Sequence, residues 1–352
     1  MTSTNSRFLD ACRRRPTDVR PVWFMRQAGR YMKQYRDIRA KAGILEICKR
    51  PDLAAQVTLQ PVEFLDVDAA IIFADLLLPL EPMGLPFEFQ AGEGPVVHHP
   101  VRTAEHVRAL RTDRADELGY VARAIQKVAT HFRDRLGIIG FCGAPFTLAS
   151  YMIEGGGSRN YIHTKQMMYR DTLTWRLLLD KIVTVLEHYC RLQVLAGADV
   201  IQIFDSWVGA LSLTDYREYA FEASKRLVRA VQQMGVPVIY FGVETAGLLS
   251  DMAATGADVI GLDWRQPLDA GWRAVGHGHA VQGNLDPITL FAPLEVLELR
   301  VNEILRAANG RPGHIFNLGH GIVPETPVEN VQAVVRMVRE FRLHTDGASA
   351  NG

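Results

Sequence analysis

Two stretches of the sequence, AGADVIQIFDS at residues 196–206 and TGADVIGLDW at residues 255–264, decide the fold prediction. In each stretch a glycine follows an amphipathic segment, a short β-branched run comes next, and an acidic residue follows that run. Glycine often stops a helix because it adopts positive φ without steric cost. Each stretch therefore predicts a helix that ends, then a buried strand, then a carboxylate at the far end of that strand.

The same alternation extends along the whole chain. Eight short apolar runs predict strands, at Pro21–Met25, Ala69–Ala74, Leu136–Phe141, Asp199–Phe204, Val236–Phe241, Asp258–Leu262, Ala280–Gln282 and His314–Leu318. Apolar residues at helical spacing predict helices at Glu117–Leu136, Thr172–Ala196, Thr214–Met234, Pro293–Ala308 and Pro327–Leu343. Strand alternating with helix predicts a parallel sheet. We therefore expect an α/β protein with one (β/α)8 TIM barrel domain over residues 1–343.

Three further features belong to this prediction. Residues 80–103 are rich in Gly and Pro and too long for a simple loop, so they predict a hairpin excursion between strands two and three. Residues 344–352 predict a disordered tail. A doubly wound sheet stays open as an alternative, because the seventh run, Ala280–Gln282, is short.

The composition narrows the class of protein. The chain has 39 Lys and Arg residues and 39 Asp and Glu residues, so no net field favours nucleic acid or an anionic membrane as a partner. Its four cysteines are widely separated and contain no C-x-x-C pair, which fits a reducing cytoplasm better than a disulfide framework. We expect no export signal and no membrane span, because Asp75 interrupts the most apolar stretch, Ala69–Leu80.

Barrel enzymes carry their chemistry at the carboxyl ends of the strands, so the residues after each predicted strand are site candidates. The polar members of this set are Arg26, Gln27 and Arg30 after strand one, Asp75 after strand two, Asp205 and Ser206 after strand four, Asp263 after strand six, Asn284 and Asp286 after strand seven, and His320 after strand eight. Arg26 and Arg30, with Arg39 nearby, would suit a ligand with several carboxylates, because a guanidinium forms bidentate charge-assisted bonds. Taken alone, each arginine is more typical of a solvated or salt-bridged residue.

The other candidates also have structural interpretations. Asp75 follows an apolar run and needs a partner if it is buried, so a structural role stays open. His320 lies between two glycines, which leaves room for a ligand, although a single histidine is more often structural. His277-Gly278-His279 precedes strand seven, at the face opposite the expected site, and is not predicted to bind metal. The chain also lacks the G-x-G-x-x-G, G-x-S-x-G and H-E-x-x-H motifs of nucleotide, hydrolase and zinc protease sites.

Two segments, PVWFMRQAGRYMKQYRDIR from residue 21 and GFCGAPFTLASYMIEGGGS from residue 140, resemble the signature regions of the uroporphyrinogen decarboxylase family. The resemblance continues through LQPVEFLDVDAAIIFADLL, IFDSWVG, GLDW, QGNLDP and NLGHG, from Pro21 to about Leu343. It implies a (β/α)8 barrel that works as a homodimer, without metal or organic cofactor, in tetrapyrrole biosynthesis. The implied reaction removes four acetate carboxyl groups from uroporphyrinogen III to give coproporphyrinogen III and CO2.

The resemblance also implies roles for individual residues. The implied substrate-binding residues are Arg26, Gln27, Ala28, Gly29, Arg30, Arg39, Asp75, Tyr151, Phe204, Ser206 and His320. Asp75 would lie under the macrocycle and stabilise the transition state, and Arg26 and Tyr151 would be further catalytic residues. Met32-Lys33-Gln34 departs from the family pattern, so the conformation of that loop stays open.

The chemistry of such a substrate agrees with these residues. A ring of pyrrole N–H groups needs a central acceptor and its carboxylates need cations, which Asp75 and the arginines would supply. Without a cofactor, the electron sink must be a pyrrole protonated at carbon, and a carboxylate would stabilise that cation. The proton donor stays open among an arginine, Tyr151, His320 and a bound water.

Two rival interpretations follow from the same resemblance. Corrinoid-dependent methyltransferases would share the fold, but they would bind zinc through His and Cys near strand five, where VIYFGVETAG contains neither residue. A catalytically silent tetrapyrrole-binding protein would not need to retain Asp75 or Tyr151, and both are present.

Overall fold

The computed structural model describes residues 6–90, 94–132 and 136–342. Its main sheet contains seven parallel strands in the order β1-β4-β5-β6-β7-β8-β9. These strands are β1 (Ala69–Ile71), β4 (Gly137–Gly143), β5 (Val200–Asp205), β6 (Val238–Gly242), β7 (Val259–Gly261), β8 (Ala280–Gln282) and β9 (His314–Ile315). The strands thus follow one another in chain order, which confirms seven of the predicted strands as a parallel sheet. The doubly wound alternative is wrong, because that fold requires the strand order to reverse.

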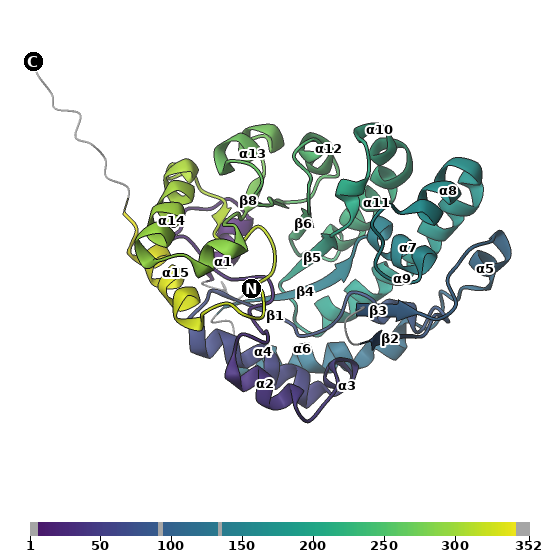
Figure 1. The fold of residues 1–352 in the computed structure, drawn as a ribbon, viewed down its shortest axis with the longest axis horizontal. Helices are drawn as coiled ribbons and strands as arrows, with labels where there is room; N and C mark the ends of the chain where they lie inside the picture. Colours follow the sequence, from purple (N-terminus) through teal and green to yellow (C-terminus); the bar gives the residue numbers. More distant parts are fainter. Residues whose placement is uncertain (1–5, 91–93, 133–135, 343–352) are drawn as a thin grey trace, which may run out of the picture.

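Helices surround the strands in an arc in Figure 1. They are α1 (Arg7–Cys12), α2 (Lys33–Arg39), α3 (Ile44–Lys49), α4 (Pro51–Leu65), α5 (Ala104–Ala109), α6 (Gly119–Phe132), α7 (Pro145–Glu154), α8 (Ile162–Arg170), α9 (Thr172–Leu195), α10 (Leu213–Asp215), α11 (Phe221–Gln232), α12 (Leu249–Ala254), α13 (Leu268–Val275), α14 (Leu294–Ala308) and α15 (Val328–Glu340). The five predicted helices correspond to α6, α9, α10 with α11, α14 and α15. Between α10 and α11 the backbone makes a π-helical turn, Tyr216–Ala220, instead of one continuous helix.

The two glycines of the quoted stretches stop their helices as predicted. Gly197 follows α9 with φ 109° and Gly256 follows α12 with φ 91°. At the other end of α9, the Asp171 carboxylate accepts a hydrogen bond of 3.1 Å from the Thr174 N–H and caps the helix. Local sequence therefore sets where the strands β5 and β7 can begin.

The predicted strand Pro21–Met25 is wrong as a strand. It forms one isolated parallel bridge, from Val22 to Phe316. Beyond this bridge its backbone donors bind side chains instead of a neighbouring strand: the Phe24 N–H donates to Gln27 Oε1 at 3.2 Å and the Met25 N–H to Asn317 Oδ1 at 3.1 Å. Side-chain acceptors have thus replaced the ladder in this segment.

The segment nevertheless lies between the two ends of the sheet. The Phe316 N–H, next to β9, donates to the Pro21 carbonyl at 2.8 Å. The Asp68 N–H, next to β1, donates to the Val22 carbonyl at 2.8 Å. Residues 21–22 therefore accept hydrogen bonds from both edges of the sheet, beside β9 and beside β1.

A second, antiparallel pair of strands comes between β1 and β4 in the chain. Strand β2 (Phe87–Gln90) pairs with β3 (Gly94–Val97). The pair is attached to the end of α7, because the Val97 N–H donates to the Gly155 carbonyl at 2.7 Å. Gly155 has φ 87°, and a Cβ there would lie 2.8 Å from Pro100 Cγ, so glycine permits this close contact.

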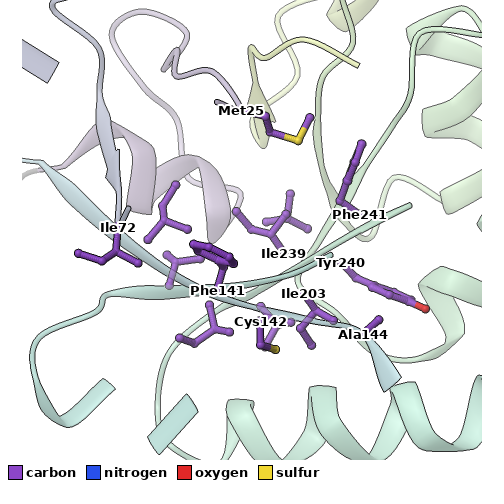
Figure 2. Close-up of a cluster of buried hydrophobic side chains, with 14 of the residues drawn as sticks. Met25, Ile72, Phe141, Cys142, Ala144, Ile203, Ile239, Tyr240 and Phe241 are labelled. Atoms are coloured by element: carbon purple, nitrogen blue, oxygen red, sulfur yellow. The ribbon is translucent and has the colours of Figure 1, made fainter. Parts of the chain in front are cut away.

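Large apolar side chains fill the inside of the curved sheet, as Figure 2 shows. Phe141 of β4 and Ile239 and Phe241 of β6 belong to this cluster and are buried. The Phe241 ring lies over Gly261 of the next strand, where a Cβ would be 2.7 Å from the ring. This packing leaves a floor of aromatic side chains at the carboxyl ends of the strands.

Two sequence predictions concern the remaining parts of the chain. The predicted tail, residues 344–352, lies outside the described residues. Among the residues that are described, no helix is both long enough and apolar enough to span a bilayer.

Candidate active site

A cavity of about 300 Å³ opens at the carboxyl ends of the strands. Its wall is mostly apolar and contains a small polar set that comes from several loops. The polar members are Arg26, Asp75, Tyr151, Ser206 and His320. The apolar members include Met25, Ala28, Ile71, Phe73, Leu76, Phe89, Pro95, Phe141, Phe204 and Phe241. An apolar cavity with a few convergent polar groups is typical of a small-molecule site.

Arg26 reaches the cavity from the turn that follows Phe24. Its backbone has φ 60°, the left-handed region that a non-glycine residue seldom adopts. Its side chain lies directly on the backbone of Gly321, where a Cβ would be 2.4 Å from Arg26 Cδ. A strained residue held by a glycine contact is typical of a functional position.

Asp75 follows β1 and is only partly buried, with its carboxylate beside the cavity. Oδ1 accepts a hydrogen bond of 2.9 Å from the Leu77 N–H. Burial raises the pKa of Asp75 to about 6, although this hydrogen bond and the positive charge of Arg26 oppose the shift. The carboxylate is therefore ionised at neutral pH.

Tyr151 is carried by α7 and lies against Trp207, with ring centroids 3.7 Å apart. The start of α7 is tied to the sheet, because the Ala144 N–H donates to the Phe204 carbonyl at 2.8 Å. Burial, with the negative charge of Asp75 adding to it, raises the pKa of Tyr151 well above its usual range. Tyr151 therefore stays protonated and can donate a hydrogen bond into the cavity.

Phe204 and Ser206 come from the end of β5 and line the same side of the cavity. The Phe204 ring lies between Phe141 and Phe241, at centroid distances of 5.5 and 6.0 Å. These edge-to-face contacts hold Phe204 in one orientation. The three rings form an aromatic wall beside the Ser206 hydroxyl.

His320 lies between Gly319 and Gly321, as the sequence suggested. A Cβ at residue 319 would be 2.3 Å from the Trp264 N atom, so glycine permits the loop to pass here. Burial lowers the pKa of His320 to about 4, and the charges of Arg26 and Arg265 add to this effect. His320 is therefore a neutral hydrogen-bonding group at neutral pH.

The structure brings together Arg26, Ala28, Asp75, Tyr151, Phe204, Ser206 and His320 in the cavity wall. Four other predicted residues lie outside this wall. Gln27 is fully buried, and its amide donates to the Ala69 carbonyl at 3.0 Å and accepts from the Phe24 N–H. Gly29 supports the turn behind Arg26, since a Cβ there would lie 2.9 Å from the Arg26 carbonyl oxygen.

The two remaining arginines are Arg30, which precedes α2, and Arg39, the last residue of α2. Arg30 is exposed, and Arg39 Nη1 donates to the Ala42 carbonyl at 2.6 Å. Burial raises the pKa of Tyr35, and the positive charges of Arg39 and Arg30 oppose this rise. The Tyr35 ring in turn packs against that of Phe73 in the cavity wall, with ring centroids 5.6 Å apart. Arg30 and Arg39 are therefore near the site without lining the cavity.

Sequence reasoning missed several apolar residues of the wall. Phe89 and Pro95 reach it from the β2–β3 pair, which only the tertiary fold places there. Phe141 and Phe241 could have been found, because each stands near the carboxyl end of a predicted strand. Apolar residues at strand ends carry no signal of a site in the sequence, because apolar packing is non-directional.

The fold and this cavity define an α/β enzyme whose site is built at the carboxyl ends of parallel strands. A solved methyltransferase from Methanosarcina mazei shares the fold, with a TM-score of 0.76 and 22% identity over 95% of this chain and 98% of that one. A family model described as uroporphyrinogen decarboxylase matches residues 3–341. The chain belongs to the uroporphyrinogen decarboxylase family, which confirms the resemblance of its motifs.

Curated relatives support the same assignment. A uroporphyrinogen decarboxylase from Solibacter usitatus is 62% identical over 337 residues, which are 96% of this chain and 98% of that protein. A uroporphyrinogen decarboxylase from Koribacter versatilis is 60% identical over 342 residues, 97% of each chain. The similarity therefore covers the strands, the loops and the cavity together.

Proposed function

We propose that this enzyme converts uroporphyrinogen III to coproporphyrinogen III by removing its four acetate carboxyl groups as CO2, without a metal or organic cofactor. The observation that carries this proposal is the carboxylate of Asp75 beside Arg26 in the wall of a mostly apolar cavity. Family membership over residues 3–341 supports the substrate and the reaction.

The reaction requires a place for the electron pair of the broken C–C bond. Protonation of a pyrrole carbon next to the acetate-bearing carbon makes the ring a cation. The bond to the carboxylate then breaks, CO2 leaves, and the electron pair neutralises the ring through an exocyclic methylene group. A second proton then adds to the methylene and makes it a methyl group, and the ring carbon loses the proton that it gained in the first step. Each decarboxylation therefore consumes one proton.

The cavity residues have complementary roles in this proposal. Asp75 accepts pyrrole N–H bonds and stabilises the ring cation, because a fixed anion in a partly dry site acts on charge that develops in the transition state. Arg26 binds a substrate carboxylate, and Tyr151, Ser206 and His320 donate or accept hydrogen bonds to the side chains of the macrocycle. Phe204 and its aromatic neighbours pack against a face of the macrocycle.

Residues outside the cavity wall also contribute to substrate binding. Arg30 and Arg39 attract the carboxylates of the bound substrate, whose side chains extend beyond the cavity wall. Ala28 contributes apolar surface, and Gln27 and Gly29 hold the turn that presents Arg26. The contacts of Gln27 and Gly29 with this turn support that division of roles.

We also propose three properties that family resemblance implies. Residues 21–22 close the seven-stranded sheet into a barrel within one domain, with one bridge and its neighbouring hydrogen bonds in the place of the eighth strand, which their hydrogen bonds to residues next to β1 and β9 support. The enzyme works as a homodimer, which sedimentation of the purified protein tests. It works in the cytoplasm, and its four free, buried cysteines support a reducing compartment.

Anaerobic incubation of the purified protein with uroporphyrinogen III tests the activity. The products are oxidised to porphyrins and separated by their number of carboxyl groups. We expect intermediates with seven, six and five carboxyl groups and a final product with four. Tight binding of substrate without any product would instead support the silent tetrapyrrole-binding protein.

A further inference from the structure

Asp205 is a carboxylate that the proposed reaction does not use. It ends strand β5 and is fully buried, between Phe204 and Ser206, which line the cavity. Successive side chains of a strand point to opposite faces, so Asp205 faces the helices while Phe204 faces the cavity. A charge that is buried there needs partners.

Two hydroxyl groups supply those partners. Thr147 Oγ1 donates to Asp205 Oδ1 at 2.7 Å, and the Tyr240 hydroxyl donates to Oδ2 at 2.8 Å. Figure 2 shows the Tyr240 ring directed away from Phe241, its neighbour in β6, on the side of Ala144. Burial raises the pKa of Asp205 to about 6, and the two hydroxyl hydrogen bonds oppose the rise. Asp205 is therefore an ionised acceptor at neutral pH.

The hydrogen bond from Thr147 to Asp205 leaves the Thr147 oxygen able to accept a hydrogen bond from another group. A threonine hydroxyl has one hydrogen, and here that hydrogen is directed to Asp205. Its oxygen is then free to accept, and the Trp207 N–H donates to it at 3.2 Å. Asp205 thus orients the hydroxyl that holds the backbone of Trp207.

Trp207 in turn contacts a cavity residue. Its ring lies against that of Tyr151, at a centroid distance of 3.7 Å and an interplanar angle of 31°. Thr147 and Tyr151 are four residues apart in α7, so they lie on the same face of the helix, one turn apart. The face of α7 that binds Asp205 is therefore also the face that presents Tyr151.

We propose that Asp205 and Thr147 are positioning residues, which hold α7 and Trp207 together so that Tyr151 is aimed at the substrate. Neither residue lines the cavity. Both act through Tyr151, whose displacement by about 1 Å is enough to cost up to about a hundredfold in rate. This inference rests on the proposed function and on the role of Tyr151 in it.

A double-mutant cycle tests the proposal. Thr147→Val keeps the shape of the side chain but removes the hydroxyl, and we expect it to lower kcat/KM about 10-fold, chiefly through kcat. In the background of Tyr151→Phe, the same change should have much less effect, because the group that it positions is already impaired. Thr147→Ser keeps the hydroxyl and should restore most of the activity.

A matched control separates positioning from stability. Thr255 is also buried, and its hydroxyl donates a hydrogen bond to the Met252 carbonyl near the end of α12. It is distant from α7 in the sequence and has no hydrogen bond to Asp205 or Trp207 among those of the described residues. Thr255→Val should destabilise the protein by a similar amount without changing kcat/KM. If Thr147→Val does not fold, Asp205→Asn replaces it in the same cycle.

The outcomes are distinct. Equal effects of Thr147→Val in wild-type and Tyr151→Phe backgrounds, or no effect in the wild type, would overturn the positioning role. Wild-type protein that forms no product would overturn the proposed function instead. In that case the double-mutant cycle is measured on the affinity for uroporphyrinogen III under anaerobic conditions. If Thr147→Val changes this affinity equally in the wild-type and Tyr151→Phe backgrounds, the positioning role is overturned, and if its effect is smaller in the Tyr151→Phe background, the positioning role is supported.

Discussion

Replacing Asp75 by Asn removes one negative charge from the cavity and changes its shape very little. The Asn carbonyl oxygen can still accept the hydrogen bond from the Leu77 N–H, which measures 2.9 Å in the wild type. The variant therefore tests the charge of residue 75 separately from its packing. At pH 7.5 the wild-type side chain is almost wholly ionised, because its pKa is about 6.

The size of the effect follows from the environment of the carboxylate. Asp75 is partly exposed to the cavity, so an effective dielectric constant of about 20 is appropriate for its interactions. A pyrrole cation about 4 Å away would then be stabilised by about 4 kcal/mol. This energy corresponds to a roughly thousandfold change in kcat. The Asn amide dipole recovers part of it, so we expect a loss of about a hundred- to a thousandfold.

Steady-state kinetics with anaerobic uroporphyrinogen III measures the loss. KM should change much less than kcat, because the cation exists in the transition state and not in the bound substrate. Asp75→Glu is the matched control, since it keeps the charge but moves it by one methylene group, and it should be more active than Asp75→Asn. Circular dichroism checks that both variants fold. Turnover of Asp75→Asn near the wild-type rate would refute the electrostatic role.

The remaining predictions concern the same cavity. Arg26→Ala and Arg30→Ala should each weaken substrate binding by about 1.5–3 kcal/mol, with partial rescue by Lys, and unchanged affinity in equilibrium titrations would make these arginines structural. The kcat/KM of the wild type should fall as the pH drops below about 6, because Asp75 is then protonated, and this acid limb should be shallower in the profile of Asp75→Asn, where Asp205, whose pKa is also about 6, still titrates. Because the pKa of Asp75 rises from 3.8 to about 6 on folding, its ionisation lowers the free energy of unfolding as the pH rises from about 4 to about 6. Asp75→Asn should therefore be more stable than the wild type at pH 7 in urea unfolding, by up to about 3 kcal/mol, and equal midpoints would contradict the cost of burying the charge. Dialysis against a chelator should leave activity unchanged, and loss that zinc reverses would favour the methyltransferase interpretation.

Most of the parallel sheet was predictable because buried parallel strands are short apolar runs, and these runs stand out between amphipathic helices. The strands β5 and β7 also had a start signal in Gly197 and Gly256, whose positive φ the structure confirms. The first run, residues 21–25, has the same composition and was misassigned. Its donors bind Gln27 and Asn317 side chains, and the second of these contacts is far away in the sequence.

The candidate site was partly predictable for a related reason. Polar residues directly after apolar strands are unusual, so Arg26, Asp75, Ser206 and His320 could be selected one by one, and the family motifs added Tyr151 and Phe204. Distances among them depend on loops from opposite parts of the chain. The approach of Arg26 to Gly321, for example, brings together the turn after residues 21–25 and the loop after β9.

The sequence by itself determined the parallel α/β fold, the glycine stops after α9 and α12, and the family, because each of these depends on local patterns of apolar residues, glycines and motifs. Only the tertiary structure decided which of the polar residues share one cavity, that Phe89 and Pro95 cover it from the β2–β3 pair, and that Asp205 holds Thr147 behind it. The physical reason is that pKa shifts, close contacts and hydrogen-bond chains depend on the burial and spacing of groups distant in sequence, which local propensity does not encode.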